Sequence, residues 1–203
     1  DRYVVTGYKN SYVYMDEFKM LFPRMHSAQA HHVDAYKSWA NVKGKKVRYN
    51  YCGQNRTEDC PTFGENLKFF FRYQVNFMYW RYFMWNFAGR QNDIQGKGEP
   101  DKGNWITGIP FIDNLMYGDQ SLLPDYMKNN KGRNVFFCLP LLLGLLGMFW
   151  QAMKSEQGIR QFWVVFFLFF MTGLAIVLYL NQTPGQPRER DYAYAGSFYA
   201  FAM

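Results

Sequence analysis

Residues 162–180 have the sequence FWVVFFLFFMTGLAIVLYL, which contains no charged side chain. An α-helix rises about 1.5 Å per residue, so roughly twenty apolar residues cross the hydrocarbon core of a bilayer. A buried helix of a soluble protein would rarely run so long without a polar face. The stretch therefore predicts a transmembrane helix, and with it a mainly α membrane protein.

A second apolar run lies upstream, VFFCLPLLLGLLGMFWQAM at residues 135–153. Gln151 is its only strongly polar residue, and membrane helices tolerate internal proline and glycine where neighbouring helices satisfy the backbone. The connection, KSEQGIRQ, is short and polar. We expect a multi-pass arrangement with two spans joined as a hairpin, which places residues 1–134 and 181–196 on the same side of the membrane.

Beyond residue 180 the chain turns and then becomes apolar again. Pro184 and Pro187 end the helix, because proline has no N–H to donate and disfavours helix in the residue before it. Gly185 permits a tight turn. We expect the charges of PRERDY to lie at the membrane surface. A third helix is expected from about residue 192, cut off at residue 203.

The composition limits the class of protein further. The sequence starts with Asp1 and ends inside an apolar run, so we expect a fragment of a longer chain. The net charge is +7, but Lys and Arg are scattered and no recognition-helix, RNP or zinc-finger pattern is present. Nucleic acid is therefore not an expected partner, and a basic surface beside anionic lipid accounts for the charge.

Residues 1–134 carry most of the charge and predict an extramembrane region of mixed structure. Residues 2–15 alternate as in a strand or hairpin, and residues 43–51, KGKKVRYNY, predict another strand. Residues 15–42 predict one or two short helices broken near Pro23. Residues 91–134 are rich in Gly, Asn, Asp and Pro, and within them NDIQGKGEPDKGNW, residues 92–105, predicts a loop.

The aromatic segment FGENLKFFFRYQVNFMYWRYFMWNFAGR, residues 63–90, is too polar to span a bilayer. Arg72 and Arg81 are nine residues apart, which puts them on opposite faces of a straight α-helix. We expect an amphipathic helix, straight or broken, in the interfacial zone with Tyr and Trp at headgroup level. Aromatic packing explains the composition; the alternative is a groove for a lipid carrier or sugar around Arg72, Trp80 and Arg81.

Three cysteines are present, and Cys138 in the apolar run is expected to be a packed thiol. Cys52 and Cys60 frame CGQNRTEDC, a loop that a disulfide would close outside the cytoplasm. Two free thiols are the alternative. No CxxC pair is present, and His31 and His32, as neighbours on a helix, do not share a face. We therefore expect no metal, and no phosphate-loop or dinucleotide fingerprint indicates a cofactor.

The charged run PRERDY is the main candidate for chemistry. Arginine suits a phosphate, because its planar guanidinium makes bidentate contacts. Arg188 or Arg190 could hold the phosphate of a lipid-linked donor, while Asp191 or Glu189 orients that arginine or acts as a base. The alternative is a self-satisfied ion cluster at a helix start, where the two acids suit the helix dipole. The adjacent acids Asp16 and Glu17 diverge on a helix and make a poor catalytic pair.

Four long runs together resemble a bacterial membrane-protein family of unknown function that is itself similar to the protein O-mannosyltransferases. They are YMDEFKMLFPRMHS, ENLKFFFRYQVNFMYWRYFMWNFAGRQNDIQG, GNWITGIPFIDN and LYLNQTPGQPRERDYAYAGSFYAFA. The resemblance covers nearly the whole chain. It implies a glycosyltransferase of the GT-C type, a multi-helix enzyme that takes a sugar from a polyprenyl-phosphate donor and transfers it outside the cytoplasm to an acceptor such as a protein hydroxyl.

The same resemblance implies a bacterial inner-membrane protein with residues 1–134 in the periplasm, against a simple count of positive charges. That count is weak evidence for long segments. The catalytic carboxylate of GT-C enzymes usually lies in the first extracytoplasmic loop, so the resemblance places it upstream of this chain. From the residues alone, a transporter or channel component and a non-catalytic membrane scaffold remain alternatives.

Overall fold

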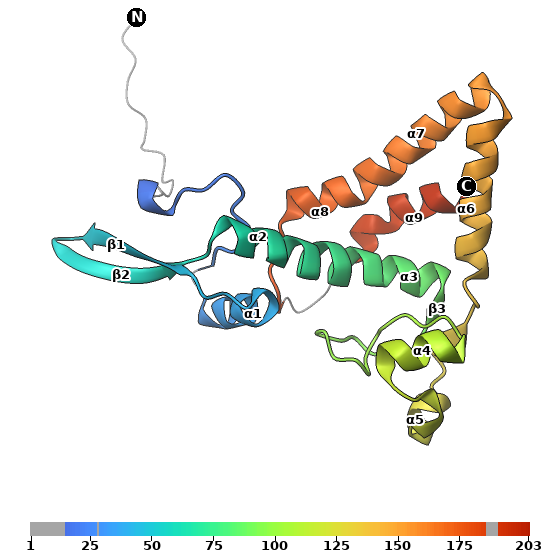
Figure 1. Ribbon diagram of the computed structural model, residues 1–203, viewed down its shortest axis with the longest axis horizontal. Coiled ribbons are helices and arrows are strands. Elements are labelled where there is room, and N and C mark those ends of the chain that lie inside the picture. Colours follow the sequence, from blue (N-terminus) through green and yellow to red (C-terminus); the bar gives the residue numbers. More distant parts are fainter. Residues whose placement is uncertain (1–14, 28, 186–190) are drawn as a thin grey trace, which may run out of the picture.

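The computed structural model describes residues 15–27, 29–185 and 191–203, and the fold is mainly helical. A long continuous helix forms its centre (Figure 1). It consists of α2 (Phe63–Phe69), the π-helical stretch η2 (Phe70–Trp80) and α3 (Arg81–Phe87). The aromatic segment expected to be helical is therefore one helix, although its middle has the wider π-helical backbone.

Two apolar helices form a hairpin beside this central helix (Figure 1). They are α6 (Leu139–Lys154) and α7 (Glu156–Thr172), and α8 (Leu174–Leu180) continues α7 after a break at Gly173. The connection is much tighter than expected, because Ser155 alone separates α6 from α7 and its hydroxyl accepts the N–H of Gly158 at 3.1 Å. A Cβ at Gly158 would lie 2.4 Å from the carbonyl oxygen of Gln151, so this glycine lets the two helices meet.

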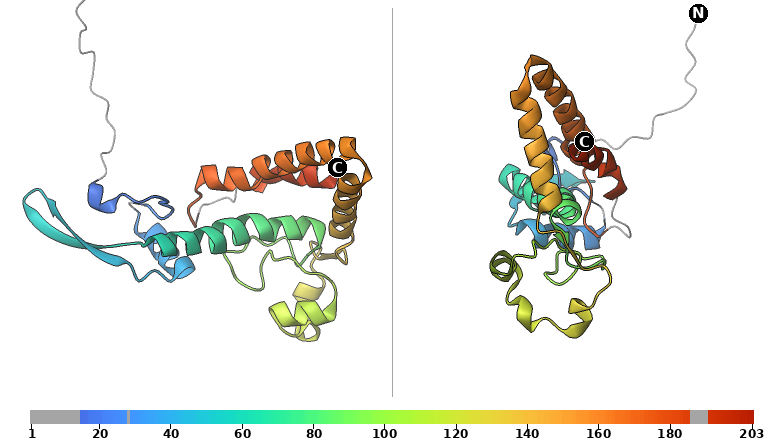
Figure 2. Two further views of the ribbon diagram at one scale, coloured as in Figure 1. Left: turned by 45° about the horizontal axis from the view of Figure 1, so that its top comes forward. Right: turned by 90° about the vertical axis from the view of Figure 1, so that its right-hand side faces the viewer.

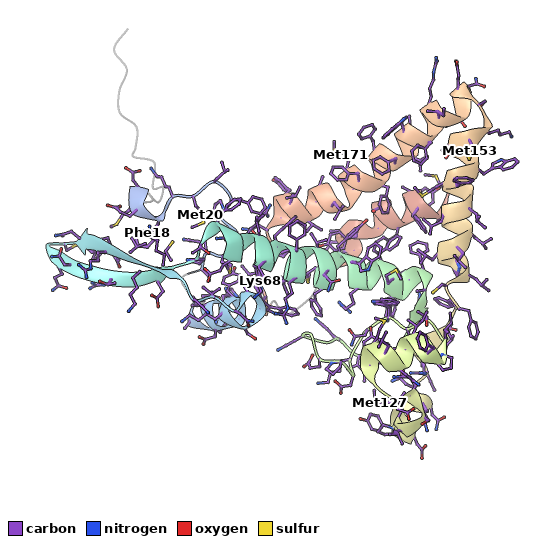
Figure 3. The ribbon with its side chains drawn as sticks, viewed as in Figure 1. Phe18, Met20, Lys68, Met127, Met153 and Met171 are labelled. Carbon is purple, nitrogen blue, oxygen red and sulfur yellow. The ribbon has the colours of Figure 1, made fainter. Side chains whose placement is uncertain are left out.

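Among the described residues, one helix is both long and apolar enough to cross a bilayer, the stretch Glu156–Leu180. Only 11% of its most apolar window is buried in the molecule, so its apolar surface is largely unpartnered. Leu139–Lys154 is apolar but has 16 residues, fewer than the roughly twenty a straight span needs. Both expected apolar segments are thus largely helical, and Met153 on α6 and Met171 on α7 are exposed (Figure 3).

The expected third helix is also present. The 3₁₀-helix η4 (Asp191–Tyr194) leads into α9 (Ala195–Ala202), which lies between α7 and the central helix (Figure 1). The hydroxyls of Tyr79 and Ser197 are hydrogen-bonded at 2.7 Å across this junction, and both residues are buried. Burial raises the pKa of Tyr79, although the hydrogen bond from Ser197 opposes that shift.

Aromatic side chains form most of the core along the central helix. One buried cluster joins its first half to α1, a second joins its last half to α6 and α9, and a third joins its middle to α8 and η4. Phe83, at the centre of the second cluster, has ring contacts at 4.9 Å with Phe201 and 5.7 Å with Phe198. The sequence-based expectation of aromatic packing in residues 63–90 is therefore confirmed.

The N-terminal part contains η1 (Asp16–Phe18), α1 (Ala30–Ala40), β1 (Lys45–Tyr51) and β2 (Gln54–Cys60). The short helical segments and the strand over 43–51 were correctly predicted, whereas the hairpin expected within 2–15 lies almost wholly outside the described residues. Strands β1 and β2 form an antiparallel hairpin that projects away from α6 (Figure 1; Figure 2, left).

Of the two alternatives for Cys52 and Cys60, the disulfide is wrong, because both cysteines are free. Cys52 lies in the tight turn, while Cys60 is at the far end of β2, paired with Lys45. A strand rises about 3.3 Å per residue, so the length of β2 separates the two thiols by roughly 20 Å. A disulfide needs its Cα atoms within about 7 Å.

The loop predicted at residues 92–105 is confirmed, since these residues form turns, bends and one bridge at Trp105, whereas the rest of residues 91–134 contains short helices. Strands β3 (Gly89–Arg90) and β4 (Asn134–Val135) pair and enclose α4 (Pro110–Tyr117), η3 (Gln120–Leu122) and α5 (Asp125–Lys128). The buried carboxylate of Asp113 accepts the N–H groups of Thr107 and Gly108, each at 2.8 Å, and the Thr107 hydroxyl. Pairing of β4 with β3 also explains why α6 begins at Leu139 rather than at residue 135.

We expect Glu65→Gln to destabilise the protein by about 1 kcal/mol, the usual cost of losing a helix N-cap interaction. Glu65 accepts the backbone N–H groups of Thr62, Lys43 and Gly44 and completes a capping box on the central helix. Burial alone would raise the pKa of Glu65, but these hydrogen bonds lower it to about 2.

Because the pKa of Glu65 is depressed in the folded state, its stabilisation is complete above the unfolded pKa of about 4.5 and is lost as pH falls towards 2. Thermal unfolding of wild type and Glu65→Gln at several pH values should therefore show a difference at pH 7 that shrinks below pH 4.5. Glu17→Gln, at an exposed site, is the matched control. A difference of equal size at pH 3 and pH 7 would contradict this assignment.

Candidate functional site

A small pocket lies where α8 ends, on one face of the central helix. Its volume is about 40 Å³. A water molecule needs roughly 10–15 Å³ by this measure, so the pocket holds about three water-sized groups. That space suits a phosphate or the hydroxyl edge of a sugar. The lining residues come from α1, the central helix, the loop after β3 and the turn after α8: Trp39, Tyr73, Phe77, Met78, Gln95, Gly96, Lys97, Gln182, Thr183, Pro184 and Gly185.

Aromatic rings form one wall of this pocket. Phe69, Tyr73 and Phe77 follow one another at four-residue intervals and stack with centroid distances of 5.2 and 5.7 Å. Trp39 lies 5.0 Å from both Tyr73 and Phe77. Gly98 lets the loop pass close to this ring, since a Cβ there would lie 2.8 Å from the Trp39 indole. The wall is therefore a rigid aromatic surface supported from two sides.

The turn after α8 forms the opposite wall. Asn181 ends α8 in the left-handed conformation, with φ of 43°, and Gly185 turns the chain with φ of 79°. The predicted stop at Pro184 and the tight turn at Gly185 are both confirmed. The PRERDY run begins two residues after Gly185 in the sequence.

Buried amides without partners are the most unusual feature of the site. Gln74 on the central helix donates through Nε2 to Asn181 Oδ1 at 2.9 Å and to the Gln182 carbonyl at 3.1 Å. Its own Oε1, and both Nε2 and Oε1 of Gln182, have no hydrogen-bond partner although all three atoms are buried. An unsatisfied buried polar group costs about 1–3 kcal/mol. Such a group in a native protein calls for a specific reason.

Arg24 fixes this turn from the N-terminal side. Its guanidinium donates to the Leu178 carbonyl at 2.8 Å and to Asn181 Oδ1 at 3.4 Å, which caps the end of α8. The backbone N–H groups of Arg24 and Met25 donate to Asn66 Oδ1 at 2.7 and 3.1 Å. Burial lowers the pKa of Arg24. This arginine therefore positions the turn and does not itself line the pocket.

Lys97 supplies the cation at the pocket rim. It is exposed, and none of the salt bridges found among the described residues involves it. With two glutamines and an aromatic wall nearby, the pocket offers hydrogen-bond donors, acceptors and one positive charge, but none of its lining residues is acidic. That set suits a neutral polyhydroxyl group or an anion rather than a metal ion. Across the described residues, no group of three or more His, Cys, Asp or Glu side chains could hold a metal.

The arginines expected to bind phosphate are not placed by the structure. Arg188 and Arg190 lie outside the described residues, and of Asp191 only the backbone is described, as the first residue of η4. In the sequence, Arg188 and Arg190 follow Gly185, which lines the pocket. The phosphate-binding role of these three residues therefore stays a prediction.

The structure does not bring Arg72, Trp80 and Arg81 together into the alternative groove. Arg72 is exposed, and the Trp80 side chain is 44% exposed. Arg81 donates to the Phe77 carbonyl at 3.0 Å and also to the Gly103 carbonyl, which ties the central helix to the loop below it. None of the three lines the pocket described above. The pocket is lined instead by Tyr73, Phe77 and Met78 of the same helix.

The sequence analysis missed Gln74, Gln182 and Arg24. Two local signals could have indicated the two glutamines. A glutamine inside an aromatic helix, at Gln74, predicts either exposure or a specific partner. The Asn-Gln pair directly after an apolar span is a second such signal. Neither signal says that the two segments meet, since they are 108 residues apart in the chain.

Comparison with known proteins adds little to this description. Residues 1–71 match the model of a family of unknown function (DUF8416), which covers about a third of the chain. No curated protein and no solved structure matches.

Proposed function

We propose that the chain is part of a multi-pass glycosyltransferase of the GT-C type in the bacterial inner membrane. It would transfer a sugar from a polyprenyl-phosphate donor to a hydroxyl of an acceptor protein outside the cytoplasm. The observation that carries the proposal is the pocket with unsatisfied buried amides at the end of a largely unpartnered apolar helix. The four long sequence runs that resemble the protein O-mannosyltransferase-like family support the choice of reaction.

The position of the pocket suits a lipid-linked substrate. The apolar helix Glu156–Leu180 ends one residue before Asn181, so a bilayer around it would have its headgroups at the level of the pocket. A polyprenyl chain would then lie along the exposed apolar surface of α7 and α8, while its phosphate and sugar reach the pocket. Residues 1–134 are on the same side, which is the periplasm in this proposal.

The pocket residues have distinct roles in this account. Gln182 would hydrogen-bond sugar hydroxyls, since a glutamine amide both donates and accepts, while Gln74 holds the Gln182 carbonyl in place. Trp39 would pack against the sugar ring. Lys97, together with Arg188 and Arg190, would offset the negative charge that develops on the leaving phosphate.

The reaction itself is a direct displacement. The acceptor oxygen bonds to the anomeric carbon as the bond from that carbon to the phosphate oxygen breaks, and polyprenyl phosphate leaves. A carboxylate supplied by a part of the protein upstream of this chain takes the acceptor proton as general base. No cofactor is needed, because the phosphate is already an adequate leaving group.

Sugar transfer in membranes that contain the whole protein tests this function. Radiolabelled polyprenyl-phosphate sugars and a periplasmic protein extract would be incubated with wild type, Arg188→Ala, Arg190→Ala and the control Arg72→Ala. We expect label transfer by wild type and a loss on the order of a hundredfold in the first two variants, the effect of removing a group that stabilises developing negative charge. Arg72→Ala should retain activity because its side chain is exposed away from the pocket.

Two results would change this account. If neither arginine variant affected sugar transfer, the proposed enzyme activity would stand, but PRERDY would have only a structural role as a turn. Absence of transfer from every donor tried, at normal expression, would contradict the proposed reaction.

A further inference from the structure

The helices α4 and α5 expose an apolar face that the pocket does not use. Phe111, Leu115 and Leu122 are each 80% exposed. We call this surface the α4–α5 face, and it consists of six side chains: Ile109, Phe111, Leu115, Met116, Leu122 and Tyr126. Exposed apolar surface of this kind usually marks a contact with a protein or a membrane.

The orientation of α4 is fixed from its inner side. Asp113 is 3% exposed and accepts three hydrogen bonds, from the backbone N–H groups of Thr107 and Gly108 and from the Thr107 hydroxyl. Gly108, with φ of 81°, leaves no room for a Cβ beside Val135. The polar side of α4 therefore faces the molecule, while Phe111 and Leu115, four residues apart on one helix face, point outwards.

The exposed apolar surface continues into α6. Phe137, Leu139 and Leu142 are each more than half exposed, and they follow α5 in the chain. The short β3–β4 pairing holds α4, α5 and the first turn of α6 in one unit (Figure 1). A partner that covers the start of α6 would therefore also lie next to the α4–α5 face.

Charge and residue type favour a lipid surface as the partner. Lys128 is the last residue of α5, and Lys131 and Arg133 lie between α5 and α6, where basic residues would meet anionic headgroups. Tyr126 suits the interface, where its ring is buried and its hydroxyl stays hydrated. A short helix such as α4, which buries a polar side and exposes an apolar one, is well placed to lie flat in this zone.

We propose that the α4–α5 face docks onto the headgroup region of an anionic bilayer, as an interfacial anchor beside the start of α6. This inference rests on the membrane embedding in the proposed function, but not on the reaction. The anchor would hold the loop after β3, and with it Lys97, at the level of the membrane surface.

Spin labels at defined positions test the anchor in proteoliposomes that contain phosphatidylglycerol. The native cysteines Cys52, Cys60 and Cys138 would be replaced by serine, and one new cysteine introduced in each variant. Leu115→Cys reports on the α4–α5 face, Val164→Cys on the exposed surface of α7, and Glu58→Cys on the polar hairpin. Accessibility to oxygen and to a nickel chelate gives the depth of each label.

We expect the label at Leu115 to lie about 5–10 Å into the boundary of headgroups and acyl chains, as for other interfacial helices. The label at Val164 should lie deep in the core and the label at Glu58 in water. A deep label at Val164 with a water-exposed label at Leu115 would overturn the anchor and leave the embedding intact. Water exposure of both labels would overturn the embedding and the anchor together. A label at Leu115 shielded from both reagents, with dipolar broadening between copies, would show a protein contact and also overturn the anchor.

Discussion

Replacing Gln182 by methionine is expected to lower sugar transfer about tenfold while leaving the protein as stable as before, or more stable. The Gln182 side chain is 6% exposed, and neither of its amide atoms has a partner. Methionine is close to glutamine in size and shape, so the substitution removes an unsatisfied polar group without creating a cavity. A loss of hydrogen bonds worth about 1.4 kcal/mol in the transition state corresponds to that tenfold change.

Stability and activity must be measured on the same preparations to separate the two effects. Thermal unfolding in detergent gives the first, and initial rates of label transfer give the second. Gln54→Met on the exposed hairpin is the control and should change neither. If Gln182→Met lowered the unfolding temperature substantially, the amide would have a structural partner and its assignment to substrate would be wrong.

Replacing Gly173 by alanine is expected to destabilise the protein by about 2–3 kcal/mol, the upper part of the range for overpacking a core. A Cβ at this position would lie 2.6 Å from both the Tyr79 hydroxyl and the Ser197 hydroxyl, and 2.9 Å from the Phe169 carbonyl oxygen. These groups belong to the central helix, α9 and α7, so no single side-chain rotation relieves the contact. The buried hydrogen bond between Tyr79 and Ser197 would be disrupted as well.

Thermal unfolding in detergent checks this expectation against a matched glycine. Gly147 on α6 has no atom within 4 Å of a built Cβ, so Gly147→Ala should be neutral or stabilising by up to about 1 kcal/mol. Removing the Tyr79 hydroxyl in the double variant Gly173→Ala and Tyr79→Phe should recover part of the loss. If Gly173→Ala and Gly147→Ala changed the stability equally, this would contradict the close packing of α9 against the break between α7 and α8.

The apolar helices were predictable because their signal is local. Residues 162–180 and 135–153 lack charge over almost a full span, and such a composition favours helix and burial in lipid whatever the rest of the chain does. The turn at Pro184 and Gly185 and the helix after residue 192 were predictable for the same reason. The break at Gly173 was not, since glycine is common in membrane helices and only the approach of Tyr79 and Ser197 explains it.

The polar hairpin shows what composition cannot indicate. The residues of β2, QNRTEDC, have no alternation of apolar side chains, so they resembled a loop and suggested that Cys52 and Cys60 could meet. Their strand is stabilised by pairing with β1 along seven residues. This register separates the two cysteines, which a count of the residues between them could not reveal.

The candidate site depends on contacts between distant segments. The π-helical backbone of η2 and the meeting of Gln74 with Gln182 both arise from packing, which one sequence does not encode in any short window. Lys97 and Trp39 enter the pocket from two further segments. Sequence patterns therefore located the apolar helices and the turn after them, while the pocket itself required the fold.

Photo-crosslinking of the donor tests the central claim most directly. A photoreactive polyprenyl-phosphate sugar would be bound to the full protein in lipid nanodiscs, irradiated, and the modified peptides identified by mass spectrometry. We expect adducts on residues that line the pocket, in peptides containing Trp39, Lys97 or Gln182, and we expect unlabelled donor to suppress them. Adducts confined to other parts of the chain, or labelling that unlabelled donor does not reduce, would contradict the assignment of this pocket to a lipid-linked sugar.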